Sequence, residues 1–193
     1  MNKIVYINAC VRKEKSRTLR LANPLLDVLR KRYDVFEIDL TENLLSPITT
    51  DLYIERCNKG ITVNERELGE KVAKADRIVI AAPFWDMSFP SVLKVFFEHI
   101  SVPDLTFINN DDGTTSGNCK SKKVLYITTR GMKIETDSVL DQGTPYLRAL
   151  SWLWGIGDVQ VLSVSGTDIY DNEVIDDLLK KEIEKGLKIC EDF

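Results

Sequence analysis

Five short apolar runs, separated by amphipathic segments, constrain the fold of this chain more than any other feature. They are KIVYIN (3–8), DVFEIDL (34–40), DRIVIAAP (76–83), KKVLYITT (122–129) and VQVLSVSG (159–166). Most are apolar at nearly every position, as in parallel strands that are buried on both faces. The pattern predicts an α/β protein: a doubly wound, five-stranded parallel sheet of order 2-1-3-4-5 with helices on both faces.

The segments between these runs favour helices. The stretch after Ser16 repeats leucines at helical spacing, although Pro24 removes one backbone donor and is expected to bend its first turns. Further helices are expected over 64–75, 90–100, 144–155 and 172–189, with a short one near 51–57 in a long connection. The chain has no repeat or Pro/Gly/Ser-rich linker, so we expect one domain spanning residues 1–193.

Composition narrows the function classes. A net charge of −4 argues against nucleic acid or an anionic membrane as the main partner. There is no secretion signal and no apolar run near the ~20 residues of a membrane span, which predicts a cytoplasmic protein with reduced thiols. The four cysteines form no C-x-x-C pair and the single histidine, His99, fits a helix face, so no metal site is expected.

In sheets of this kind, ligands bind beyond the carboxyl ends of the strands, where the strand order reverses. The loop after the first strand lacks G-x-G-x-x-G but carries the Ser16 and Thr18 hydroxyls, Arg12, Arg17 and a helix N-terminus. These groups suit a phosphate. The alternative is a helix cap flanked by solvated arginines.

Two further loops are expected at the same place. PFWDMSFP (83–90) would offer a flat apolar surface, unless Phe84 and Trp85 fold back onto the core. Arg130 and Gly131 follow the fourth strand, where glycine lets the backbone approach a ligand closely, unless this is an ordinary turn. A phosphate site, an apolar face and a polar edge together match flavin mononucleotide (FMN).

Several motifs resemble the FMN-dependent NAD(P)H azoreductases and quinone reductases of the flavodoxin-like superfamily. AAPFWDMSFPSVLKVFFEHI resembles that family's Ala-Pro-Met-Tyr-Asn-Phe segment with its following helix, and KKVLYITTRGM its Ser-Arg-Gly-Gly segment. DQGTPYLRALSWLWGIGDV is similar to its Thr-Pro-Tyr-Leu and Gly-Ile-Thr-Asp-Val segments, and SRT stands at its Ser-x-Ser phosphate loop. The resemblance covers most of residues 3–190.

The resemblance implies a flavodoxin-like fold and a ping-pong exchange on bound FMN, in which NAD(P)H gives electrons that a quinone or azo compound then takes. No protein acid or base is required. Phe107 and Trp85 are candidates for flanking the acceptor; the alternative for Phe107 is plain packing. The cofactor-binding residues it implies are Cys10, Ser16, Arg17, Thr18, Pro83, Phe84, Trp85, Asp86, Met87, Thr129, Arg130 and Gly131. Cys10, Asp86 and Met132 depart from the family's serine, asparagine and second glycine, which bears on the geometry and potential of the site.

The resemblance also implies a homodimer with a shared active site. An excess of aromatic residues near the expected crevice points the same way, because an exposed apolar patch usually marks an interface. These residues are Phe84, Trp85, Phe89, Phe107, Trp152 and Trp154. Two rival functions remain: a flavodoxin-type electron carrier without its own NAD(P)H turnover, and a flavin-free regulatory domain on the same fold.

Overall fold

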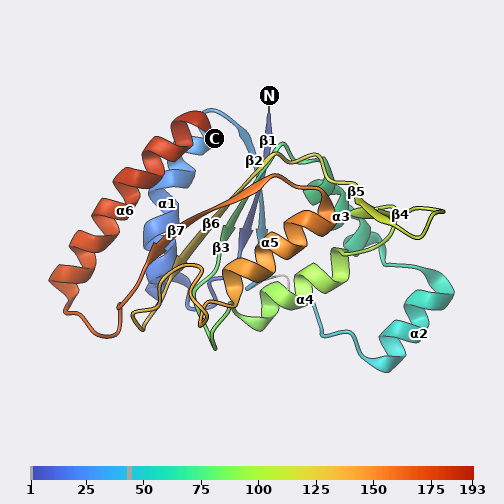
Figure 1. Cartoon of the computed structure of the whole chain (residues 1–193), viewed down its shortest axis with the longest axis horizontal. Helices are drawn as coiled ribbons and strands as arrows, with labels where there is room; N and C mark the ends of the chain where they lie inside the picture. The colour runs from blue at the N-terminus through green and yellow to red at the C-terminus, as the bar shows by residue number, and fades with distance from the viewer. Residues whose placement is uncertain (1, 43–44) are drawn as a thin grey trace.

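A parallel five-stranded sheet forms the centre of the molecule (Figure 1). The computed structural model describes residues 2–42 and 45–193. The strand order β2-β1-β3-β6-β7 confirms the expected 2-1-3-4-5 arrangement. The strands are β1 (Lys3–Asn8), β2 (Asp34–Asp39), β3 (Arg77–Ala81), β6 (Lys123–Thr129) and β7 (Asp158–Val164).

Helices cover both faces of this sheet. One face carries α1 (Arg17–Leu29) and α6 (Asn172–Asp192). The other carries α3 (Val63–Lys74), α4 (Ser91–Ile100) and α5 (Gly143–Trp154). Pro24 lies inside α1, which runs through it. Among the described residues, no helix is long and apolar enough to cross a membrane.

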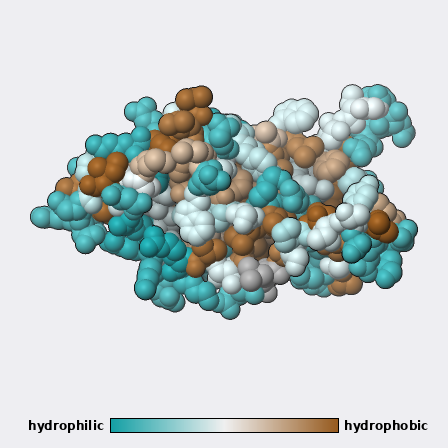
Figure 2. Space-filling view, turned by 90° about the horizontal axis from the view of Figure 1, so that it is seen from below, coloured by the Kyte–Doolittle hydropathy of each residue, from teal (hydrophilic) through white to brown (hydrophobic). Residues whose placement is uncertain are grey.

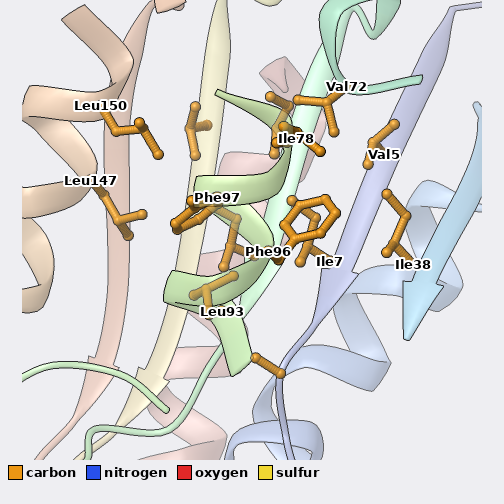
Figure 3. Close-up of a cluster of buried hydrophobic side chains, with 14 of the residues drawn as sticks. Val5, Ile7, Ile38, Val72, Ile78, Leu93, Phe96, Phe97, Leu147 and Leu150 are labelled. Atoms are coloured by element: carbon orange, nitrogen blue, oxygen red, sulfur yellow. The ribbon is translucent and has the colours of Figure 1, made fainter. Parts of the chain in front are cut away.

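The two layers explain why the central strands β1, β3 and β6 are apolar at nearly every position. Neighbouring residues of a strand point to opposite faces of a sheet, so Val5 and Ile7 enter the core beneath α3, α4 and α5, whereas Ile4 and Tyr6 enter the core beneath α1 and α6. Figure 3 shows the first core, with aromatic rings of α4 seated on the sheet and leucines of α5 beside them. Two such cores hold the carboxyl ends of the strands in register.

A small antiparallel hairpin was not expected from the sequence. It joins β4 (Phe107–Asn109) to β5 (Thr115–Gly117). Its last residue packs against the end of α5, where a Cβ on Gly117 would lie 2.0 Å from the Gly155 nitrogen. The hairpin is therefore fixed at the end of α5, and Figure 1 shows it projecting there from the body of the molecule.

The long connection after β2 forms α2 (Thr50–Lys59), longer than the expected helix near 51–57, and residues 43–44 lie outside the described part. His99 is buried in α4, as its position on a helix face indicated. Its Nδ1 lies 2.5 Å from Glu65 Oε1 of α3, and its Nε2 lies 2.8 Å from the Ser46 carbonyl. His99 thus ties this connection to α3 and α4.

Candidate functional site

A crevice opens at the carboxyl ends of β1, β3 and β6, where the strand order reverses. Figure 2 views this end of the molecule, where apolar patches alternate with polar surface. The hollow has a volume of about 100 Å³. Its walls are Arg12, Ser16, Arg17, Thr18, Pro83, Phe84, Trp85, Thr129, Gly131, Thr167 and Asp168. The three loops that the sequence predicted to converge do meet here.

The first wall is the start of α1. Ser16 precedes the helix, and its Oγ accepts a hydrogen bond of 3.3 Å from the Leu19 amide. The amides of Arg17 and Thr18 have no acceptor among the described residues, as at most helix N-termini. Thr18 Oγ1 lies 2.7 Å from Thr129 Oγ1, which joins this wall to β6. Free amides at the positive end of a helix dipole suit a phosphate.

The second wall is a strained turn after β3. Trp85 and Ser88 exchange both backbone hydrogen bonds, at 3.1 and 2.8 Å. Asp86 (φ 47°) and Met87 (φ 62°) between them both have positive φ, the arrangement of a type I′ turn. A positive φ raises the conformational free energy of a residue such as methionine. Backbone strain of this kind is frequent at functional sites. Phe84 is buried and Trp85 is exposed, so the alternative of folding back onto the core holds only for Phe84.

The third wall is the loop after β6, and here the structure corrects one expectation. Arg130 is fully buried, and its guanidinium lies 2.9 Å from Asp141 Oδ2 and 2.9 Å from the Ile134 carbonyl. Its backbone amide already donates to Val164. Arg130 therefore cannot bind a ligand in the crevice through either group; instead it stacks 5.2 Å from the Phe84 ring and holds that wall in place.

Gly131 is the residue of this loop that faces the crevice. A Cβ at this position would lie 2.2 Å from Asp168 Oδ2, so the Gly131 backbone lies directly beside the Asp168 carboxylate. Thr129 lines the crevice beside it, whereas Asp86 and Met87 lie at the tip of the turn, outside the walls.

The sequence reasoning missed Thr167 and Asp168, which follow β7. The Thr167 amide and hydroxyl both donate to the Arg130 carbonyl, and the Asp168 amide donates to Gly131. The Asp168 carboxylate lies 2.8 Å from the Arg17 guanidinium. The available signal was the position of these residues just after a strand in the sheet, at the same edge as the other loops.

Cys10 lies behind the phosphate wall rather than on it. It is fully buried and lines a second hollow with Asn8, Ser16 and Asp39. Burial raises the pKa of the Cys10 thiol to about 12, so the thiol is neutral at physiological pH. Cys10 therefore supports the loop from below, with its Sγ 3.5 Å from the Ala81 carbonyl.

The aromatic residues that were expected to form one exposed patch are partly buried and partly exposed. Phe84, Phe89 and Trp154 are buried, and Phe97 contacts both Phe89 and Trp154 edge to face. Trp152, in contrast, is 75% exposed on α5. The exposed aromatic surface is thus smaller than the sequence suggested: Trp85 is exposed at the turn beside the crevice and Trp152 near the far end of α5.

Phe107 lies far from the crevice of its own chain. It belongs to the hairpin at the end of α5, whereas the Gln142 amide at the start of α5 donates to the Met87 carbonyl beside the crevice. The 12 residues of α5 separate the two by about 18 Å at 1.5 Å per residue. Phe107 therefore does not line the crevice of its own chain.

Comparison with known proteins gives consistent matches. The family model described as flavodoxin-like fold matches residues 2–187. An FMN-dependent NADH:quinone oxidoreductase of Clostridium beijerinckii is 32% identical, and a second protein of that name, from Clostridium acetobutylicum, is 28% identical; both alignments cover all of both chains.

Solved structures show the same fold. An azoreductase of Bacillus anthracis superposes with a TM-score of 0.84 at 18% identity and covers both chains fully. A second structure from that organism, an FMN-dependent NADH-azoreductase in complex with FMN, has a TM-score of 0.75 at 22% identity and covers 98% of this chain and 100% of its own.

Proposed function

The chain belongs to the flavodoxin-like fold family, among the FMN-dependent NADH:quinone oxidoreductases, and from this premise we propose that it passes electrons from NAD(P)H through FMN to quinones or azo compounds. The exchange is of the ping-pong type, with donor and acceptor using one crevice in turn. The observation that carries the proposal is the meeting of three loops in that crevice. The four free cysteines suit a reducing compartment such as the cytoplasm.

Each wall has a separate task in this proposal. The amides of Arg17 and Thr18, with the Ser16 hydroxyl, hold the phosphate. Phe84, Trp85 and the turn that follows bound the ring, and the backbone at Gly131 with Thr129 meets its polar edge. When bound, FMN supplies the hydride and electron chemistry, and the protein supplies placement and electrostatics. The site therefore needs no protein acid or base.

Direct reduction by NADH tests this function against the electron carrier. The full chain, loaded with FMN and mixed rapidly with NADH without oxygen, should lose its flavin absorbance and recover it when a quinone is added. A carrier would keep its oxidised spectrum. A chain that takes up no FMN at all would point instead to the flavin-free regulatory domain and contradict the proposal.

Asp86 is expected to tune the reduction potential. A carboxylate at the turn beside the ring opposes added negative charge on the cofactor. Asp86→Asn should therefore raise the two-electron potential by about 10–30 mV, since 30 mV corresponds to about 1.4 kcal/mol. Asparagine also tolerates the positive φ of Asp86, so the turn is kept. Asp27→Asn, remote on α1, is the control, and equal potentials for both variants would place Asp86 away from the ring.

The same proposal includes a homodimer in which each crevice is completed by the neighbouring chain. The exposed face of α5 carries Pro145, Ala149 and Trp152 at helical spacing, and the start of this helix adjoins the turn with the exposed Trp85 and Met87. Apolar side chains in such number at one edge usually mark an interface. In this dimer the neighbouring chain would bring Phe107 to the crevice, which Phe107 does not reach within its own chain.

Trp152→Glu is expected to convert the dimer into monomers. FMN affinity should fall at the same time, because the neighbouring chain completes each crevice in this proposal. Truncating a central aromatic of an interface commonly costs 2 kcal/mol or more, and a buried charge adds to that, so we expect dimer affinity to fall by about 30-fold or more. Sedimentation at micromolar concentration measures the mass. The control is Val174→Glu on α6, which is 40% exposed on the opposite face of the sheet. A wild-type holoprotein that sediments as a fully active single chain would refute the dimer.

A further inference from the structure

Asp168 stands out because it is the one acidic residue among the described residues that line the crevice. The other charged side chains of the lining are Arg12 and Arg17. Asp168 bonds to Arg17 at 2.8 Å, and Arg17 is the first residue of α1, directly after Ser16. The guanidinium of the residue that begins α1 is therefore engaged by a carboxylate from the loop after β7.

The backbone of Asp168 is fixed, but its side chain is not. The Asp168 amide donates to the Gly131 carbonyl at 3.1 Å, and the preceding Thr167 donates twice to the Arg130 carbonyl. The side chains of the ion pair remain accessible, with 31% of Arg17 and 72% of Asp168 exposed. The Asp168 carboxylate can thus leave Arg17 by a rotation of its own side chain, with no change in the fold.

An exposed ion pair of this kind is weak, because water and salt screen both charges. A phosphate seated on the α1 amides would offer Arg17 a dianion with several acceptor oxygens, and arginine binds such groups in a bidentate manner. We infer that Asp168 stays paired with Arg17 while the crevice lacks flavin, and that the phosphate of FMN displaces the Asp168 carboxylate from Arg17. This exchange sets the preference of the site for phosphorylated over unphosphorylated flavin.

This inference rests on the phosphate position given in the proposed function. Under this inference, Asp168 determines which flavin the site prefers and does not merely support the walls of the crevice. Removing its charge frees Arg17 and takes a negative charge away from the phosphate, so both effects strengthen FMN binding. Riboflavin, which has no phosphate, gains nothing from a free Arg17.

The test is a fluorescence titration of the flavin-depleted full chain with FMN and with riboflavin. At low ionic strength, Asp168→Asn should tighten FMN about three- to tenfold, as expected for one charge several ångströms away in a solvated site. Riboflavin affinity should change less than about twofold, and the FMN gain should shrink at high ionic strength. Asp176→Asn is the matched control, because Asp176 forms a similar exposed pair with Arg20, one turn further along α1.

A second pair of variants distinguishes the displacement of Asp168 from Arg17 from simple charge repulsion between Asp168 and the phosphate. In an Arg17→Gln background, Asp168→Asn should tighten FMN clearly less than in the wild-type background, because only the repulsion between carboxylate and phosphate is then relieved and no guanidinium remains to be freed. An equal gain in both backgrounds, or no gain in the first, would overturn the exchange. Failure of the phosphate position itself would appear elsewhere, as equal weakening of FMN and riboflavin by Ser16→Ala with Thr18→Ala.

Discussion

Asp141→Asn is expected to lower the free energy of unfolding by about 3–5 kcal/mol, because it leaves the buried Arg130 guanidinium without its counter-charge. Both side chains have 0% exposure. Asp141 also accepts hydrogen bonds from the amides of Asp137, Gly143 and Thr144. Since Arg130 stacks on Phe84, FMN binding should weaken along with stability.

Denaturant unfolding measures the change, with Asp137→Asn as the control in the same loop. Asp137 pairs with Arg148 at the surface, where such pairs contribute only about 0–1 kcal/mol. Similar losses for the two variants would contradict the distinction between a buried and an exposed pair.

The stabilisation from Asp141 should also depend on pH. Burial alone would raise the pKa of Asp141, but its contacts with Thr144 and Asp137 and the charge of Arg130 outweigh this and lower the pKa. A carboxyl with a lowered pKa in the folded state stabilises above its unfolded pKa of about 3.9 and loses this contribution in more acidic solution. The difference between wild type and Asp141→Asn should therefore be full near neutrality and narrow below about pH 4.

Replacing Ser16 and Thr18 together by alanine should weaken FMN by about 100-fold or more and riboflavin far less. A hydrogen bond to a charged group contributes about 1.5–3 kcal/mol, and the change removes the Ser16 donor together with the Thr18 hydroxyl that joins this wall to β6. Parallel fluorescence titrations with the two flavins measure the ratio. The burial of Thr18 and its bond to Thr129 mean that part of its effect acts through the position of that wall.

Helix capping needs its own control, because Ser16 also caps α1. Thr49→Ala removes the same kind of cap from α2, where the Leu52 amide lies 3.3 Å from Thr49 Oγ1. This variant should lose about 0.5–2 kcal/mol of stability and keep its FMN affinity. A comparable loss of both flavins in the Ser16/Thr18 variant would show that this loop does not hold the phosphate.

The hairpin shows where the sequence held a usable signal that apolar patterning did not reveal. Thr115–Gly117 is exposed throughout, so it lacks the apolar run that identifies a buried strand. The turn between the two strands contains Asp112 and Gly113, with a positive φ at Gly113. Asp-Gly between short β-compatible segments is a strong hairpin indicator, and it would have predicted β4 and β5.

Local sequence was sufficient to predict the five strands of the parallel sheet, their order and the three converging loops. Burial on both faces of a parallel sheet requires apolar residues at consecutive positions, and this requirement is visible within six or seven residues. The reversal of strand order then places the loops after β1, β3 and β6 at one edge. The general position of the candidate site follows from these two facts alone.

The tertiary structure alone decided which side chains face the crevice. Arg130 and Gly131 are adjacent in sequence, yet one turns inward to Asp141 and the other lines the crevice. Arg17 and Asp168 are separated by 151 positions and meet only because β7 ends beside β6 and α1 begins beside β1. Side-chain direction and long-range charge pairing depend on packing between elements, and no pattern within a single element records them.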